Sequence, residues 1–238
     1  MVNRKGAADR KIDIVDALLV LADRIGPDRL TTNDVARTVG VTQAAIFRHF
    51  PSKDELWAAA GEALEARLIA AWEEAAASAA DPETRVRALV EAQLAQIERT
   101  PALPAILHSR ELGVSNGALR DSCNRLVIGF RDRLAGNLEA MAEAGALRPD
   151  LDPGDGAMLL VSLVQGLAIR WTLGARNFSL PAEGMRMLDV QLGLFSGPAS
   201  SHAPCSRPLQ DSGGSGSAQG RTDPADARPD RRPERHGS

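Results

Sequence analysis

Apolar residues recur along most of this chain at intervals of three and four positions, the spacing that places them on one face of a helix. Ile14, Leu18, Leu21 and Ile25 follow this spacing near the start of the chain. No stretch alternates convincingly between apolar and polar residues, as a strand would. Further helices are expected over residues 53–79, 82–100, 101–112, 115–145, 153–173 and 181–195. The pattern therefore predicts an all-α protein.

Residues 30–57 differ from ordinary helical sequence because capping and turn residues divide them into short helices. Thr31 and Asp34 have the spacing of a capping box at the start of one helix, and Thr42 can cap the next. Gly40 lies between them, where a reversal of the chain favours a residue that adopts positive φ. Two short helices joined by a tight turn form the shape that places one helix in a DNA major groove.

The packing expected between these two helices agrees with a helix-turn-helix. A steep crossing over a short turn needs a small residue at the crossing, here Ala36, and an apolar residue beneath it, here Ile46. Pro51 ends the second helix, because the residue before a proline is driven out of the helical region. Ser52 and Glu55 then have the Ser-x-x-Glu spacing that begins a third helix.

This segment and the helix before it resemble the DNA-binding domain of the tetracycline-repressor (TetR) family over roughly residues 12–60. The matching residues are Thr31-Thr32, Gly40-Val41-Thr42, Phe47-x-His49-Phe50 and Lys53. The resemblance implies an N-terminal three-helix helix-turn-helix domain followed by a larger helical domain for ligand binding and dimerisation. It also implies a transcriptional regulator and not an enzyme. We expect a repressor that binds a palindromic operator as a dimer and is released by a small-molecule effector, with an activator as the alternative.

The resemblance and the composition together divide the chain into four parts. Residues 12–56 are expected to bind DNA, and residues 57–196 to bind ligand and dimerise. Residues 1–11 form either a flexible basic arm that reaches a minor groove or a plain solvated terminus. Residues 197–238 are rich in Gly, Ser, Pro and charged side chains, which predicts a disordered tail. The basic residues of segment 1–11 are Arg4, Lys5, Arg10 and Lys11.

Four side chains of the second short helix are not needed inside the domain and are candidates for base contacts. Gln43 can pair with two atoms of an adenine edge, and Arg48 can pair with guanine or meet a phosphate. Ala44 and Phe47 offer apolar contact to thymine methyl groups. We therefore predict that these four residues read the DNA sequence.

Four other residues match positions at which the family commonly contacts the phosphate backbone: Thr32, Thr42, His49 and Lys53. Such contacts set the register of the protein on DNA without carrying sequence information. Phe47 stands where the family usually has tyrosine, so one hydroxyl contact to the backbone is expected to be lost.

The last two predicted helices, 153–173 and 181–195, are apolar nearly all round. A helix that is apolar on several faces must be covered on several faces, and a domain of this size is too small to enclose both. A second copy of the chain is the expected cover, as the family's dimerisation through its last two helices also implies. A compact monomer with both helices central is the alternative. The candidate interface residues are Val161, Ala168, Met187 and Leu194.

A ligand pocket in the larger domain is implied by the resemblance more than by the residues themselves. Its candidate lining residues are Gln93, His108, Phe130 and Trp171, with Trp72 as a weaker candidate. Few aromatic residues and no dominating charge leave three ligand classes open: a hydrophobic drug-like compound, a metabolite or an acyl derivative.

The net charge of −3 and the pI of about 5.9 would alone argue against binding to nucleic acid. The charge is unevenly distributed, however. Residues 1–53 hold nine Lys or Arg and six Asp, a balance of +3, which leaves −6 for the rest of the chain. Positive charge is therefore concentrated in the segment that resembles a DNA-binding domain, which supports double-stranded operator DNA as a partner.

Other classes of protein are poorly supported by the residues. Gly154-Asp155-Gly156 lacks the third glycine of a dinucleotide-binding loop and the four histidines are scattered, so no enzyme, cofactor or metal site is expected. A helical adaptor that binds only protein would leave the turn and the basic cluster unexplained. Cys123 lies on an apolar stripe, which favours a buried thiol over a redox sensor. Without a secretory leader or a long uninterrupted apolar run, we expect a cytoplasmic protein with no membrane partner.

Overall fold

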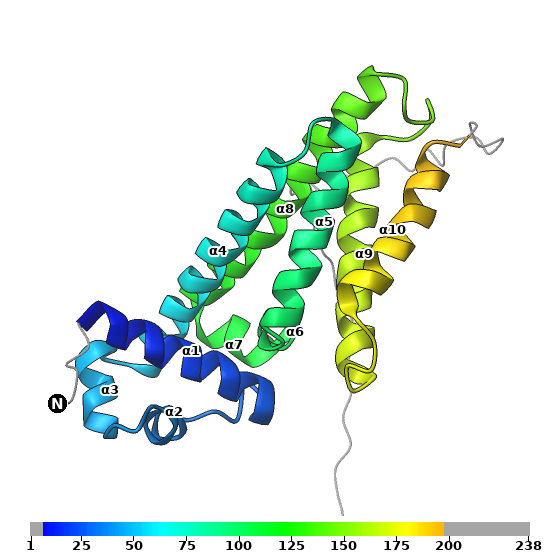
Figure 1. Cartoon of the computed structure of the whole chain (residues 1–238). Coiled ribbons are helices and arrows are strands. Elements are labelled where there is room, and N and C mark those ends of the chain that lie inside the picture. The colour runs from blue at the N-terminus through cyan, green and yellow to red at the C-terminus, as the bar shows by residue number, and fades with distance from the viewer. Residues whose placement is uncertain (1–6, 198–238) are drawn as a thin grey trace, which may run out of the picture. The chain divides into compact units, whose positions relative to one another are not determined.

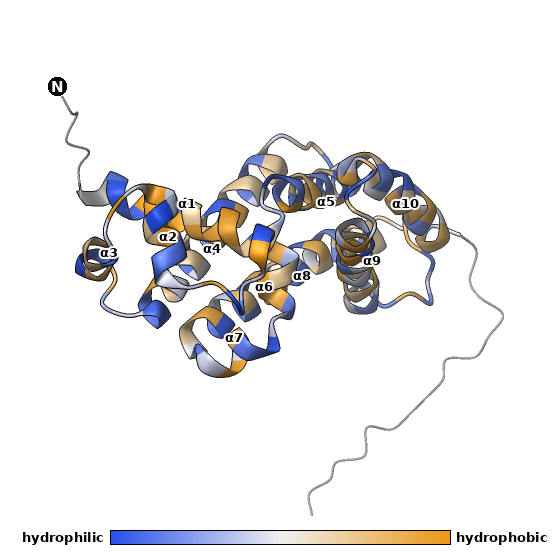
Figure 2. Cartoon of the chain, turned by 90° about the horizontal axis from the view of Figure 1, so that it is seen from below, coloured by the Kyte–Doolittle hydropathy of each residue, from blue (hydrophilic) through white to orange (hydrophobic). Residues whose placement is uncertain are grey.

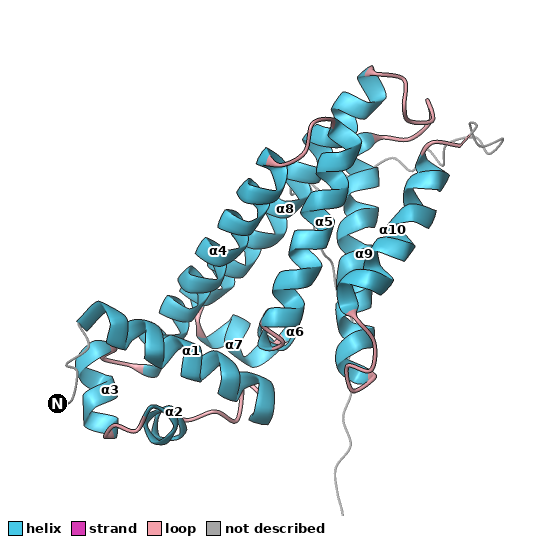
Figure 3. Cartoon of the chain, in the orientation of Figure 1, coloured by secondary structure: helices cyan, strands magenta, loops and turns pink. Residues whose placement is uncertain are grey.

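The structure, a computed structural model, describes residues 7–197 and folds them into ten helices with no strand in that range (Figure 1, Figure 3). This confirms the predicted all-α fold. The tail expected over residues 197–238 lies, apart from Gly197, outside the described residues. The helices are α1 (Ala7–Ile25), α2 (Thr32–Val39), α3 (Gln43–His49), α4 (Lys53–Ala77), α5 (Pro82–Arg99), α6 (Ala102–His108), α7 (Arg110–Ser115), α8 (Gly117–Glu143), α9 (Pro153–Leu173) and α10 (Leu180–Phe195).

The first three helices share a small apolar core. Ile14 of α1, Val35 of α2 and Ile46 of α3 are fully buried in it. Because α1 begins at Ala7, the basic residues Arg10 and Lys11 lie on this helix and not in the flexible arm expected over residues 1–11. The other two basic residues of that arm, Arg4 and Lys5, lie outside the described residues.

The helix α4 leads from the first three helices directly into the larger helical body. Ser52 caps it, because its Oγ accepts a hydrogen bond from the Glu55 backbone N–H at 3.1 Å, and the helix then runs for 25 residues. In the body, α4 packs on α5 and α8, α8 packs on α9, and α10 lies against α5 and α9. Figure 2 shows hydrophobic residues on α1, α4 and α6 where these helices come together, in agreement with the contacts of α1 with both others.

Trp72 of α4 connects three helices inside the body. Its indole Nε1 donates a hydrogen bond to Gln93 Oε1 of α5 at 2.9 Å. Its ring stacks on Phe130 of α8, with 5.4 Å between the ring centroids. A buried indole needs an acceptor for its N–H, so this pairing accounts for the presence of a glutamine in an otherwise apolar interior.

The stretch from 101 to 112 forms two helices and not the single helix that the sequence predicts. Ser109 lies in an extended conformation between α6 and α7, with φ −70° and ψ 109°. Its Oγ accepts a hydrogen bond from the Leu112 backbone N–H at 3.1 Å and donates one to Asp28 Oδ1 at 2.5 Å. The helix therefore breaks where a serine both caps α7 and bonds to the loop after α1.

Among the described helices, α9 alone is long and apolar enough to cross a membrane by these two criteria. Leu160, Val164 and Leu167 form a buried stripe on it, and α9 packs against α8 and α10. Burial in the helical body therefore explains part of its apolar content, and a second apolar face of α9 stays exposed.

Candidate nucleic-acid interface

The start of α2 has the capping geometry that the sequence predicts. The Asp34 backbone N–H donates to Thr31 Oγ1 at 3.2 Å, and the Thr31 backbone N–H donates to Asp34 Oδ2 at 3.0 Å, which completes a capping box. At the other end, Gly40 has φ 76° and ψ 36°, and its N–H bonds to the carbonyls of Ala36 and Arg37. These bonds satisfy groups that a short helix leaves unpaired at its ends, so α2 and its turn are well defined.

The short helix α3, which the sequence predicts to read DNA, is held from its inner face. Thr42 caps it by accepting a hydrogen bond from the Ala45 N–H at 3.2 Å. Ile46 is fully buried and Phe50, directly after the helix, is 4% exposed. The Nζ of Lys11 in α1 lies 5.5 Å from the Phe50 ring centroid. The inner face of α3 is thereby fixed on the domain core, and its other face is left to the solvent.

All four residues predicted to contact bases lie on that exposed face of the recognition helix. Gln43, Ala44 and Arg48 are exposed, and 40% of Phe47 is exposed although it is a large apolar side chain. An exposed phenylalanine beside polar residues offers apolar contact to a partner. The structure therefore brings these candidates together on one surface, where their contact with DNA stays a prediction.

The four residues predicted to contact phosphate differ in how exposed their side chains are. Thr42 is exposed, and His49 and Lys53 are half-buried at the end of α3 and the start of α4. Thr32, in contrast, is 9% exposed, and its Oγ1 accepts a hydrogen bond from Gln43 Nε2 at 2.8 Å. Three of the four are thus accessible to a DNA backbone, whereas Thr32 is engaged within the protein.

Asp34, the acidic residue of α2, is held by hydrogen bonds and an ion pair with its neighbours. Hydrogen bonds from the Thr31 side chain and from Arg37 hold the pKa of the Asp34 carboxyl below its usual value. The Arg37 guanidinium also forms an ion pair with this carboxylate. Asp34 is therefore ionised and paired at neutral pH, which reduces its repulsion toward a phosphate backbone.

A narrow cavity lies inside the larger helical body. It has a volume of about 50 Å³, and its lining includes Gln93, His108 and Phe130, three of the four predicted pocket residues. Trp72, the weaker candidate, also lines it. Gln165 of α9 is a further polar residue of the lining, and it was not predicted from the amino-acid sequence.

Trp171, the fourth predicted pocket residue, does not line this cavity. Its Nε1 donates a hydrogen bond to the Phe178 carbonyl at 3.0 Å, and the Arg176 guanidinium lies over its ring at 5.1 Å. The indole therefore packs against the turn that follows α9. The spacing of Val161, Gln165 and Ala168 on α9 is the signal that identifies the face of this helix on the cavity.

The dimer-interface prediction requires a correction. Val161 and Ala168 are 4% and 3% exposed and line the cavity of their own chain, so they are not available to a second copy. Met187 is half-buried, and Leu194 is 60% exposed. The exposed large apolar residues of α9 and α10 are Met158, Leu159, Ile169, Leu173, Val190 and Leu194. We call this set the α9–α10 apolar face.

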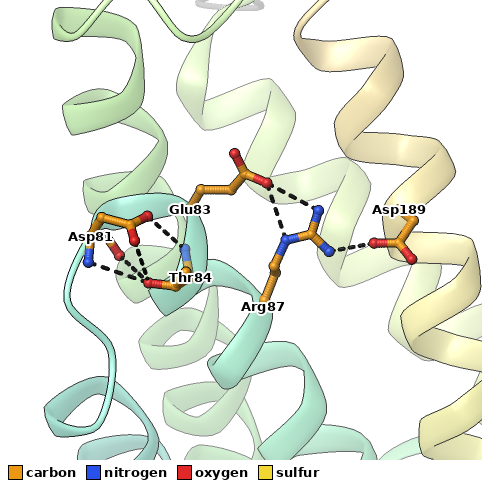
Figure 4. Close-up of polar contacts among 5 residues, drawn as sticks. All are labelled: Asp81, Glu83, Thr84, Arg87 and Asp189. Carbon is orange, nitrogen blue, oxygen red and sulfur yellow. Dashed lines mark hydrogen bonds and ion pairs between the residues drawn. The ribbon is translucent and has the colours of Figure 1, made fainter.

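Another side of α10 is attached to α5. Arg87 of α5 forms an ion pair with Asp189 of α10 and also with Glu83 one turn earlier in its own helix (Figure 4). In the same view, Asp81 and Thr84 form the capping box that begins α5. Because α5 holds one side of α10, the side that carries Val190 and Leu194 remains exposed.

No group of three or more metal-ligating side chains occurs within residues 7–197. Cys123 is half-buried in α8, and burial raises the pKa of its thiol to about 11. The thiol is therefore protonated at neutral pH and a poor nucleophile, in keeping with a structural position.

Two family models match the chain. Residues 14–60 match the bacterial regulatory proteins of the tetR family, and residues 82–192 match the C-terminal domain of BetI-type transcriptional repressors. The first match covers α2, α3 and most of α1, and the second runs from the start of α5 into α10.

Similar curated proteins include nucleoid occlusion factors named SlmA. The SlmA of Marinobacter nauticus is 30% identical over 170 residues, which cover 70% of this chain and 84% of that protein. The SlmA of Vibrio cholerae is 35% identical over 119 residues, which cover 50% of this chain and 61% of that protein. The chain thus spans about three fifths of the length of the Vibrio relatives.

Similar solved structures share the fold at low sequence identity. A TetR-family transcriptional regulator from Rhodococcus sp. has a TM-score of 0.67 and 22% identity, with 79% of this chain and all of that chain covered. The fatty acid degradation regulator FadR of Bacillus halodurans has a TM-score of 0.68 and 20% identity, with 80% and 97% covered. FadR of Bacillus subtilis in complex with stearoyl-CoA has a TM-score of 0.66 and 16% identity, with 77% and 98% covered.

Proposed function

Because the chain belongs to the TetR family of DNA-binding transcriptional regulators, we propose that it is a repressor controlled by a small-molecule effector. It binds a palindromic operator as a dimer, and the effector releases it. The exposed face of α3, with Gln43, Ala44, Phe47 and Arg48, is the observation that supports sequence reading most directly. The match of the larger domain to BetI-type repressors supports repression over activation.

The dimer is supported by the α9–α10 apolar face. Leu173 and Leu194 are 82% and 60% exposed, and both are large aliphatic side chains. Large apolar side chains exposed on two neighbouring helices support an interaction site. A second copy that covers this face with its own α9 and α10 gives a two-fold symmetric pair, and a symmetric pair matches a palindromic operator.

The effector site is the cavity lined by Trp72, Gln93, His108 and Gln165. Among the described residues, no lysine, arginine or carboxylate lines it, so the part of the effector that enters is uncharged and largely apolar. Its volume of about 50 Å³ is well below the roughly 300–1,000 Å³ of ligand pockets in general. An effector must therefore widen the cavity, and this displacement of its walls is what alters the DNA-bound form.

Selection from random DNA tests this function. The purified chain is incubated with a pool of random duplexes, and the recovered fragments are sequenced. The proposal predicts enrichment of one inverted repeat whose removal from a promoter raises transcription in cells that carry the chain. Recovery of fragments that share no sequence would contradict it.

Nucleoid occlusion is a second candidate, favoured by the similarity to the SlmA proteins over 84% of the Marinobacter protein. The two functions differ in their consequences. Loss of a repressor changes transcription next to its operators, whereas loss of a nucleoid occlusion factor changes where cells divide relative to the nucleoid. Microscopy and transcript profiling of a deletion strain distinguish them.

A further inference from the structure

A side-chain hydrogen bond joins the first residues of α2 and α3 across the helix-turn-helix. Gln43 Nε2 donates to Thr32 Oγ1 at 2.8 Å. Gln43 is exposed on the recognition helix, whereas Thr32 is only 9% exposed. The bond therefore attaches a side chain on the DNA-facing surface to a hydroxyl that is held inside the pair of helices.

The Thr32 hydroxyl is well placed to act as a fixed anchor. Thr32 directly follows Thr31, whose capping box with Asp34 fixes the backbone at the start of α2. Arg37 holds the Asp34 carboxylate in turn. Because threonine is branched at Cβ, its side chain has few accessible rotamers on a fixed backbone. The position of Oγ1 is thus set by local structure that does not depend on DNA.

The bond leaves Gln43 the groups that it needs to read a base. Its amide carries two N–H hydrogens and one carbonyl oxygen, and only one N–H is given to Thr32. The remaining N–H and Oε1 form the donor–acceptor pair that matches N7 and N6 of adenine. An untethered surface glutamine would lose rotamer freedom when it binds, whereas a tethered one loses less.

We propose that Thr32 is a positioning residue that holds Gln43 for base reading, and not a phosphate contact. This inference rests on the proposed function, because it presupposes that α3 reads DNA. It deepens that function, since discrimination at one base pair of each half-site then depends on a residue that touches no base.

The test compares Thr32→Val, which removes the hydroxyl, with Thr32→Ser, which keeps it. Dissociation constants of the full chain are measured for the selected operator and for duplexes changed at single base pairs, over a range of salt concentrations. The base pair read by Gln43 is the one at which Gln43→Ala loses discrimination. Thr32→Val should reduce discrimination at that pair by roughly 3- to 10-fold, with other pairs and the salt dependence unchanged. Thr32→Ser should retain discrimination.

Two comparisons make the result specific. In the Gln43→Ala background, Thr32→Val should cause no further loss of discrimination, because the side chain that it positions is gone. Lys53→Ala shows how a predicted phosphate contact behaves. Its affinity should fall equally for all DNA sequences, and the slope of log affinity against log salt concentration should decrease by about one unit. Circular dichroism and thermal melting confirm that each variant is folded, and Thr32→Ala replaces Thr32→Val if the latter does not fold.

Three results would overturn the inference alone. Thr32→Val could behave like Lys53→Ala, which would make Thr32 a phosphate contact. Thr32→Val could leave discrimination between base pairs unchanged. Thr32→Ser could lose as much discrimination as Thr32→Val. Either result would show that the hydroxyl does not position Gln43. An unsubstituted chain that prefers no sequence would overturn the proposed function itself, and the inference with it.

Discussion

At the residue scale, Gly40 determines the direction in which the recognition helix leaves α2. Its φ of 76° lies in the left-handed region, and its N–H closes α2 on the carbonyls of Ala36 and Arg37. A Cβ added there would meet no atom within 4 Å. The requirement for glycine is therefore one of backbone conformation and not of space.

Replacing Gly40 with alanine should lower the free energy of unfolding by about 1 kcal/mol, because a Cβ disfavours the left-handed conformation. Gly136→Ala is the matched control, since Gly136 lies on an exposed face of α8 and also has no atom within 4 Å of an added Cβ. There alanine should stabilise by about 0.5–1 kcal/mol through helix propensity. Urea denaturation of both variants measures the difference. Equal stabilisation by both would contradict the role assigned to Gly40.

At the scale of elements, the attachment of α10 to α5 and α9 determines which of its faces is exposed. A Cβ added to Gly184 would lie 2.2 Å from Leu94 Cδ1, so the two helices approach closely at this point. The Leu180 backbone N–H donates to Glu98 Oε1 at 2.9 Å, and Asp189 pairs with Arg87. These contacts hold α10 along much of its length.

Gly184→Ala should destabilise the chain by about 1–3 kcal/mol, because Leu94 is fully buried and cannot move aside freely. The displaced α10 should also weaken dimerisation, since it carries part of the α9–α10 apolar face. Thermal unfolding and analytical ultracentrifugation measure the two effects, with Gly136→Ala again as the control. A fully stable Gly184→Ala dimer would show that the close approach is not needed.

Glu183 connects α9 and α10 and makes their attachment dependent on pH. Hydrogen bonds from Arg186 and then Arg170 lower the pKa of its carboxyl to about 2, from a usual value of 4.5. A lowered pKa in the folded state means that the stabilisation is present above pH 4.5 and is lost as the pH falls toward 2.

The thermal midpoint of the unsubstituted chain should therefore exceed that of Glu183→Gln at pH 7, and the difference should shrink between pH 4.5 and 2. Because Glu183 is at the surface, added salt should reduce the difference at neutral pH. Melting curves for both proteins over this pH range are the measurement. A difference that stays constant down to pH 2 would contradict the shifted pKa.

Elements that depend on local chemistry could be predicted from the sequence, and those that depend on distant partners could not. Thr31, Thr42 and Ser52 cap their helices through residues three positions away, so each pattern identifies a helix start. The break at Ser109 could not be predicted in this way, because its hydroxyl bonds to Asp28, 81 residues earlier in the chain.

The same limit explains the errors on α9. Its sequence is apolar nearly all round, so composition alone does not show which face packs on α8 and which is left for a partner. Val161 and Ala168 were expected at the interface and instead line the cavity, whereas Leu173 is exposed. Periodicity predicts that a helix is buried, but the tertiary fold decides on which side.

At the scale of the whole molecule, three acidic residues in and directly after α1 connect the DNA-binding helices to the larger body. Asp16 pairs with Arg67 of α4, and Asp23 pairs with Arg176 in the turn between α9 and α10. Asp28 accepts the hydrogen bond from Ser109, directly after the cavity residue His108. Under the proposed function, a displacement of the cavity walls would reach α1 and the loop after it through α4, the turn after α9 and the break after α6.

The dimer should depend on the α9–α10 apolar face. Leu194→Glu places a charge on this face, so it should yield a folded monomer with much weaker operator binding, because each recognition helix then acts alone. Val114→Glu is the control, since Val114 is 77% exposed on α7 and outside that face. Sedimentation velocity and gel shifts measure both properties. If Leu194→Glu remained a dimer, the dimer interface would have to lie on another surface.

The spacing of operator half-sites shows whether two copies of α3 read DNA together. A two-fold dimer should contact half-sites about one helical turn, roughly 34–36 Å, apart on one side of the duplex. The measurement is the dissociation constant for the selected inverted repeat and for the same repeat with about five base pairs inserted at its centre, which turns one half-site to the opposite side. If two copies of α3 bind together, the insertion should reduce affinity to nearly that of a single half-site. Equal affinity for both duplexes, with one chain bound to each half-site independently, would contradict it.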